Sequence, residues 1–171
     1  MRTPLIVANW KMHMTVSPAL GLVAEIKAAL RDLRGVEVVI CPPATALTAV
    51  AEVLRGTPFV LGGQTMHWEP QGAYTGEISA AMLADVGCRA VLIGHSERRL
   101  YFGETDEAVG WKVRSAFAAG LSPIVCVGER LEERQAGETD GVITRQVRAA
   151  VRDTAAADLP RLAVAYEPVW A

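Results

Sequence analysis

Residues that could transfer protons follow three short apolar segments of this sequence. Asn9 and Lys11 come after the first segment, His95 and Glu97 after a later one, and Glu167 after the last. A glutamate can act as a general base, and a histidine as an acid or hydrogen-bond donor, when both reach the same substrate. A lysine beside them would meet a phosphate or a developing enolate oxygen, and an asparagine could orient it. These residue types predict proton-transfer chemistry if the fold brings them together.

Each of these residues also has an ordinary structural explanation. Lys11 could be a surface lysine, His95 a satisfied core or surface histidine, and Glu167 a helix cap or a solvated loop acid. The segment around His95 favours function, because Gly94 permits a tight exit from a strand and the residues after His95 begin a short helix. A helix N-terminus disfavours positive charge, so this imidazole is expected to be a neutral donor or acid.

A hinged loop is predicted directly behind the candidate base. Pro168, Val169 and Trp170 follow Glu167 at the end of the chain. A stiff proline and a large aromatic residue after a strand-end carboxylate are typical of a loop that opens and closes over a site.

Short β-branched segments alternate six times with amphipathic segments. The strand candidates are apolar on both faces, which is typical of parallel strands covered on both sides. Ser17 is expected to cap the first helix, with Pro18 at its first position. Strands are predicted at residues 5–8, 36–40, 59–61, 90–93, 123–127 and 162–166, and the main helices at 17–33, 44–54, 79–86, 105–118 and 139–156.

This alternation predicts the α/β class, either as an open doubly wound sheet or as a closed (β/α)₈ barrel. A doubly wound nucleotide-binding sheet should carry a Gly-rich phosphate loop after its first strand. Asn9, Trp10 and Lys11 occupy that position instead. Polar residues at successive strand ends favour a barrel with its site on one face. We therefore expect residues 1–171 to form a single, partial barrel domain.

The composition excludes several classes of function. The chain is 51% hydrophobic and 21% charged, with a net charge of −2, which is typical of soluble globular proteins and disfavours nucleic acid or an anionic membrane as a partner. The three widely spaced cysteines suit a reducing cytoplasm, and no signal-peptide pattern opens the chain. Motifs for metal, nucleotide or thiol chemistry are not found, so no cofactor is expected.

Five motifs together resemble the triosephosphate isomerase family, in order and at the family's spacing over the whole chain. They are Ala8-Asn9-Trp10-Lys11, Gly72 to Glu77, Ile93-Gly94-His95-Ser96-Glu97-Arg98-Arg99, Val127-Gly128-Glu129 and Ala165-Tyr166-Glu167-Pro168-Val169-Trp170. The resemblance implies an enzyme of glycolysis and gluconeogenesis that interconverts dihydroxyacetone phosphate and D-glyceraldehyde 3-phosphate without a cofactor.

The resemblance also implies roles for the site residues. Glu167 would be the base that removes a carbon-bound proton, and His95 the neutral electrophile that moves protons between oxygens. Lys11 would supply positive charge near the phosphate and enediolate with Asn9 beside it, and Glu97 would support the site. Glu129 would hydrogen-bond Trp170 at the base of the lid.

A homodimer is implied as well. A loop of about fifteen residues follows the third predicted strand, and loops of that length are usually functional or interfacial. In the family this loop enters the active-site region of the other subunit. Thr75 would reach across, and Met14 would lie near its landing point.

A barrel of this class has eight strands and about 250 residues. This chain accounts for six strands, so we expect the polypeptide alone to be partly folded or aggregation-prone, with low or absent activity, because two apolar strands would become sheet edges. The alternatives are a non-catalytic fragment that acts by association through those edges, and, more weakly, a different sugar-phosphate barrel such as an aldolase or epimerase.

Overall fold

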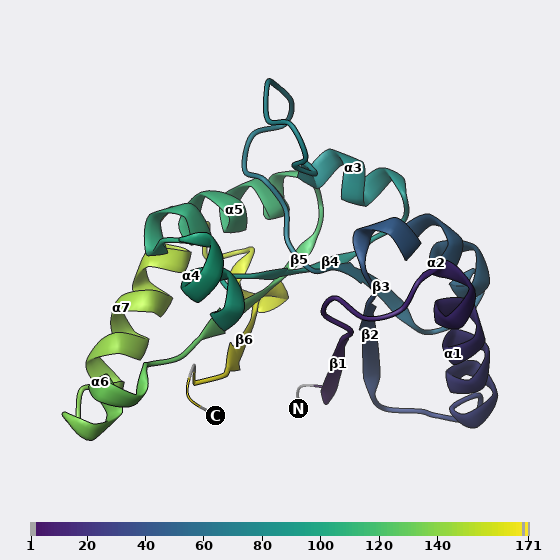
Figure 1. Cartoon of the computed structure of the whole chain (residues 1–171), viewed down its shortest axis with the longest axis horizontal. Helices are drawn as coiled ribbons and strands as arrows, with labels where there is room; N and C mark the ends of the chain where they lie inside the picture. The colour runs from purple at the N-terminus through teal and green to yellow at the C-terminus, as the bar shows by residue number, and fades with distance from the viewer. Residues whose placement is uncertain (1–2, 169, 171) are drawn as a thin grey trace.

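Six parallel strands form one sheet in which each strand pairs with the next along the chain (Figure 1). The computed structural model describes residues 3–168 and 170. Right-handed crossovers between strands added in one direction place every connecting helix on the same face. The sheet therefore curls around its other face. The strands are β1 (Leu5–Asn9), β2 (Glu37–Cys41), β3 (Val60–Gly63), β4 (Ala90–Ile93), β5 (Ser122–Val127) and β6 (Ala163–Tyr166).

Helices cover the convex face of this curved sheet (Figure 1). The long helix that follows β4 packs against β4, β5 and the helix that precedes β6. The helices are α1 (Val16–Ala29), α2 (Leu47–Leu54), α3 (Ala80–Asp85), α4 (Ser96–Phe102), α5 (Asp106–Ala118), α6 (Leu131–Gln135) and α7 (Thr139–Val151), with short 3₁₀ helices η1 (Ala44–Ala46) and η2 (Leu159–Arg161). This arrangement confirms the predicted (β/α)₈ fold class, with six strands present.

Alternate strand residues form two apolar layers. In β4, Val91 and Ile93 point to the layer beneath the helices, and Ala90 and Leu92 point to the concave face. The outer layer is the larger and contains most of the buried helix residues. This period-2 alternation, with apolar residues on both faces, is what parallel strands between two layers require.

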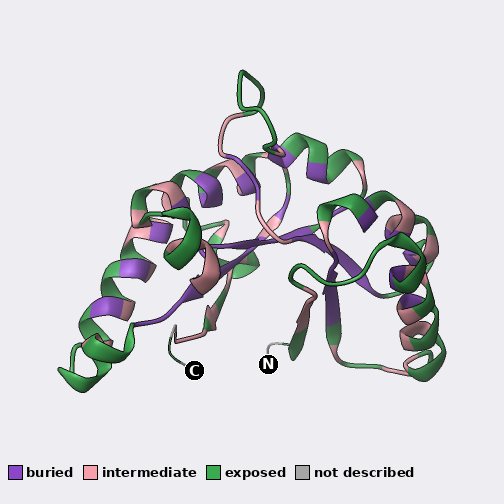
Figure 2. Cartoon of the chain, in the orientation of Figure 1, coloured by how far each residue is buried: buried purple, intermediate pink, exposed green. Residues whose placement is uncertain are grey.

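The two outer strands differ from the predicted burial. Strands β2 to β5 are almost wholly buried, whereas Ile6 in β1 is 57% exposed and Val164 and Tyr166 in β6 are 49% and 52% exposed (Figure 2). Each outer strand pairs with a neighbour on one side only within the described part of the chain. The expectation that all six strands are covered on both faces is wrong for these two, and the expectation that they form sheet edges is confirmed.

Several element boundaries also differ from the prediction. Helix α1 begins at Val16 and ends at Ala29, so Thr15 rather than Ser17 is its N-cap, and Pro18 is its third residue. A proline is tolerated anywhere in a first turn, because those N–H groups have no partner within the helix. The short helix α6 was not predicted from the sequence. Among the described residues, no helix is long and apolar enough to span a membrane.

Candidate active site

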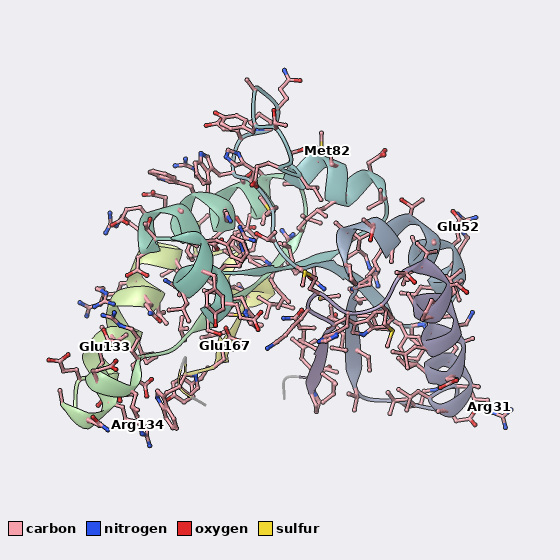
Figure 3. The ribbon with its side chains drawn as sticks, in the orientation of Figure 1. Arg31, Glu52, Met82, Glu133, Arg134 and Glu167 are labelled. Atoms are coloured by element: carbon pink, nitrogen blue, oxygen red, sulfur yellow. The ribbon has the colours of Figure 1, made fainter. Side chains whose placement is uncertain are left out.

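A pocket of about 650 Å³ lies between the carboxyl ends of β1 and β6 and the start of α4. Parallel strands end at the same rim of a curled sheet, so polar residues after different strands meet there. Glu167, labelled in Figure 3, lies at the end of β6 beside α4. The structure brings together six of the predicted residues in the lining of this pocket: Asn9, Lys11, His95, Glu97, Glu167 and Pro168.

Lys11 is held in a strained backbone conformation. Its φ of 52° lies in the left-handed region, which costs a residue with a Cβ about 1–3 kcal/mol unless its surroundings enforce it. The Lys11 N–H donates to Asn9 Oδ1 at 3.0 Å, and the Lys11 carbonyl accepts from Gln64 Nε2 at 2.9 Å. Gln64 also donates to the carbonyl of Cys41 at the end of β2. Three strand ends therefore fix the direction of this lysine.

Lys11 and Glu97 form an ion pair on one side of the pocket. Lys11 Nζ lies 2.8 Å from Glu97 Oε1, and both side chains are about half exposed. This hydrogen bond raises the pKa of Lys11, with added attraction from the Glu97 and Glu167 charges, against a smaller opposing effect of burial. The same bond is the main cause that lowers the pKa of Glu97. Lys11 thus stays cationic and Glu97 anionic across the neutral range.

The two ring nitrogens of His95 have different partners, which are the backbone of α4 and the side chain of Glu167. Nδ1 accepts the backbone N–H of Glu97 at 3.3 Å, as the N-cap of α4. Glu97 Oε2 also lies 3.5 Å from Nδ1, but an amide always carries its proton, so the N–H contact decides that Nδ1 is the unprotonated nitrogen. The ring proton then belongs on Nε2, which lies 3.1 Å from Glu167 Oε2.

The other Glu167 oxygen is bound by the main chain of α4. The Ser96 N–H donates to Oε1 at 2.5 Å. The carboxylate therefore bridges the imidazole and the first turn of a helix, where the dipole favours negative charge. The contact with Ser96 could not be foreseen from the sequence, because any residue type supplies a backbone N–H.

Glu129 binds the last residue of β6, a residue that follows β6 and a residue of α6. It is fully buried and accepts Tyr166 Oη at 3.0 Å, Trp170 Nε1 at 3.2 Å and Arg134 at 3.4 Å. Burial alone would raise the pKa of Glu129, but hydrogen bonds from its own backbone, Trp170, Tyr166 and Arg134 outweigh burial and lower it. The contact expected between Glu129 and Trp170 is therefore present. Val169, predicted in the same hinge, lies outside the described residues.

Two further charged side chains bind the backbone of Gly94, the residue directly before His95. Glu104 accepts the Gly94 N–H at 2.8 Å, and Arg99 donates to the Gly94 carbonyl at 2.8 Å. Glu104 is itself paired with Lys112 and Arg98, both at 2.7 Å. Glu104 and Lys112 were not predicted from the sequence. A signal existed for Lys112, because it lies on the buried face of α5 with residues 109, 113 and 116, where an unpaired lysine would be costly.

The three cysteines lie in the interior of the fold. All are buried and free. Burial raises the pKa of Cys41 and of Cys88 to about 12. Burial, together with the nearby Glu167 carboxylate, raises the pKa of Cys126 further. These thiols stay protonated, as expected of small buried hydrophobic residues.

The two residues predicted at a dimer interface lie apart from the pocket. Thr75 is exposed on the loop between β3 and α3, which projects beyond the helices (Figure 1). Met14 is 42% exposed, with a φ of 73°, before α1. Neither is among the described residues that line the pocket. Their predicted role concerns a second subunit and is not tested within one chain.

Gly128, between β5 and Glu129, has no room for a side chain. A Cβ there would lie 2.2 Å from the Glu167 carbonyl oxygen and 2.8 Å from Pro168 Cα. We predict that Gly128→Ala forces these backbones apart and lowers the free energy of unfolding by about 1–3 kcal/mol, as overpacking does. Urea denaturation measures the change.

Gly141→Ala is the matched control for that substitution. Gly141 lies in α7, and a Cβ there meets nothing within 4 Å. Alanine is expected to stabilise this helix by about 0.5–1 kcal/mol. Equal effects of the two substitutions would contradict the predicted clash at Gly128.

Known proteins resemble this chain in sequence and in structure. Residues 4–171 match a family model described as triosephosphate isomerase. The chain is 54% identical over 171 residues to a protein named triosephosphate isomerase from Symbiobacterium thermophilum, and 51% identical to one from Carboxydothermus hydrogenoformans. It covers 67% and 68% of those proteins, and they cover all of it. A crystal structure of triosephosphate isomerase from Bartonella henselae superposes with a TM-score of 0.92 at 44% identity, over 99% of this chain and 70% of that one.

Proposed function

The chain belongs to the triosephosphate isomerase family, and we propose that its pocket interconverts dihydroxyacetone phosphate and D-glyceraldehyde 3-phosphate. The observation that carries the proposal is the 3.1 Å approach of His95 Nε2 to Glu167 Oε2, in a pocket that also contains Lys11. A base, a proton donor and a fixed cation are what proton transfer next to a carbonyl of an anionic substrate requires.

In the proposed mechanism Glu167 takes a proton from the carbon beside the substrate carbonyl and returns it to the neighbouring carbon. The electron pair of the broken C–H bond forms a C=C bond with the carbonyl carbon, and the π electrons of the carbonyl move onto its oxygen, which gives an enediolate. His95 Nε2–H donates to that oxygen and lets the proton change places between the two oxygens. The Ser96 N–H occupies Glu167 Oε1, so Glu167 must exchange this contact for the substrate before it acts.

Lys11 and Asn9 supply the electrostatic part of this proposal. The Glu97 partner keeps Lys11 cationic, and the strained turn at Lys11 directs its side chain to the pocket rim. A fixed ammonium stabilises charge as it develops without reorganising. Glu129 and Trp170 are proposed as the anchor of the hinge that includes Pro168 and Val169.

We also propose the wider setting that the family implies. Residues 1–171 would act as one partial barrel domain in the cytoplasm, in glycolysis and gluconeogenesis, with no partner beyond triose phosphates and a second copy of the chain. The exposed Thr75 loop and Met14 would form that dimer contact.

One observation favours a second candidate function. Ile6, Val164 and Tyr166 expose apolar surface on the two outer strands. Unpaired strands of this kind recruit other strands. A polypeptide of these 171 residues could therefore act by association with an intact chain or with its own copy, without catalysis.

A coupled isomerase assay on the purified polypeptide tests the proposed function, with Glu167→Gln as the control for contaminating host enzyme. We expect a rate above that control but low in absolute terms, because Lys11 and Glu97 are half exposed and water reaches the pocket. A rate equal to the control would contradict catalysis by this polypeptide and favour the associative function. Membership of the family would stand in either case.

A further inference from the structure

Gln146 binds both polar groups of a single backbone residue at the end of β5. Its Oε1 accepts the Gly128 N–H at 2.8 Å, and its Nε2 donates to the Gly128 carbonyl at 3.1 Å. Gln146 is 5% exposed and lies on α7, which packs against α5 and β5. A buried amide that binds the N–H and the carbonyl of one residue fixes the orientation of the two peptide groups that flank its Cα.

Gly128 in turn touches the main chain of Glu167. Strands β5 and β6 pair as far as Val127 and Tyr166, and the Glu167 N–H makes the next bond, to the Val127 carbonyl at 2.8 Å. Gly128 then leaves the ladder, and its Cα lies so close to the Glu167 carbonyl that no Cβ fits between them. A shift of the Gly128 peptide therefore moves Glu167 or breaks its last bond to β5.

We propose that Gln146 is a positioning residue for the Glu167 carboxylate. Gln146 is not among the described residues that line the pocket and acts only through Gly128. A strand end beyond the last ladder bond would otherwise be free to move, whereas the helix behind it is anchored by burial. This inference rests on the proposed function in one respect only, which is that Glu167 must be placed accurately for catalysis.

The same arrangement recurs one strand away, which supports the assignment. Gly94, directly before His95, also has its N–H and its carbonyl bound by side chains, in that case Glu104 and Arg99. His95 follows Gly94, and Glu167 contacts Gly128. In both cases side chains bind the N–H and the carbonyl of the glycine. Gln146 thus binds the glycine that contacts Glu167, as Glu104 and Arg99 bind the glycine before His95.

The test compares Gln146→Met, Gln146→Glu and the control Val142→Ala. Methionine keeps the volume and removes both hydrogen bonds, whereas glutamate keeps the acceptor for the Gly128 N–H and loses the donor to its carbonyl. Val142 is buried one turn earlier on α7, so its truncation loosens the same helix without touching Gly128. The readouts are amide hydrogen exchange at Glu167, with the amides of β4 as reference, and the separate kinetic constants kcat and KM.

We expect Gln146→Met to lower the protection of the Glu167 amide at least tenfold relative to β4, and kcat about 10–100-fold with KM changed less than about threefold, since a misplacement of 1 Å can cost about 100-fold. Gln146→Glu should also lower the protection of the Glu167 amide relative to β4 and lower kcat. Val142→Ala should leave both quantities unchanged. Equal loss of protection at Glu167 and β4, or the same pattern in Val142→Ala, would overturn the proposal.

The two readouts separate this proposal from the proposed function. If the parent polypeptide has no isomerase activity, the proposed function fails for it, and hydrogen exchange alone decides the role of Gln146. If Gln146→Met does not fold, Gln146→Glu carries the comparison. If neither folds while Val142→Ala does, Gln146 serves general stability and the positioning role is wrong.

Discussion

His95→Asn is expected to lower kcat in the isomerase assay by about 10²–10⁴-fold, the usual contribution of a positioned proton donor. The substitution is chosen because His95 also caps α4 through Nδ1, which accepts the Glu97 N–H. Asparagine is a favourable N-cap and can accept that bond, but it lacks the Nε2–H that faces Glu167. The helix should therefore keep its start while the proposed proton transfer is lost.

The control for that result is His13→Asn. His13 is exposed in the segment before α1 and outside the pocket lining. We expect it to leave kcat within about twofold of the parent and the thermal midpoint unchanged, since surface substitutions away from special features have small effects. A loss of less than tenfold in His95→Asn, with α4 intact by circular dichroism and NMR, would remove His95 from the proton-transfer step.

The strand-end part of the site could be predicted because it depends on a simple pattern. β4 occupies residues 90–93, as predicted, and the strand ends at Gly94, whose φ of 75° suits a glycine. Polar residues directly after such strands must lie at one rim of the sheet. Lys11, His95 and Glu167 follow β1, β4 and β6, and the pocket contains all three.

The supporting residues could not be predicted in the same way, because their partners are distant in sequence. Gln146 binds a residue eighteen positions earlier, and the Lys112 ammonium reaches Thr65 as well as Glu104. A polar side chain on a helix is usually solvent-exposed, so residue type alone does not indicate burial. The signal for Gln146 was its position on α7. Val142, Gln146 and Ala150 follow one another at intervals of four residues, and all three are buried.

The start of α1 could not be fixed from residue types alone. Thr15, Ser17 and Pro18 all suit the first turn of a helix by residue type, and the first four N–H groups need no partner within the helix. Type alone therefore cannot distinguish a start at Val16 from one at Pro18. The positive φ at Met14 turns the chain into α1 earlier than the capping pattern indicates.

Glu104→Gln is expected to lower the free energy of unfolding at pH 7 by about 3–5 kcal/mol, the usual cost of removing one partner from a buried ion pair. Lys112 is 4% exposed, so it would keep a buried charge without its carboxylate. The Gly94 N–H would still have an amide oxygen as acceptor, which limits the loss to the charge interaction. Glu52→Gln is the matched control, because Glu52 pairs with Arg55 at the same 2.7 Å in a largely exposed position and should cost less than about 1 kcal/mol.

The pH dependence of this difference follows from the pKa of Glu104. Burial by itself raises that pKa, but Lys112 and Arg98 outweigh burial and hold it below its ordinary value of 4.5. A carboxyl with a lowered native pKa stabilises the fold fully above its unfolded pKa and loses that contribution as the pH falls through the native value. The difference in unfolding free energy between parent and Glu104→Gln should therefore be constant from pH 7 to about 5 and shrink below 4.5.

Because Glu97 and Glu129 also have lowered pKa values, the parent alone would not isolate this group, and the difference between the two proteins is the quantity to measure. A difference that persists unchanged to pH 3 would mean that Glu104 acts through packing rather than through its charge.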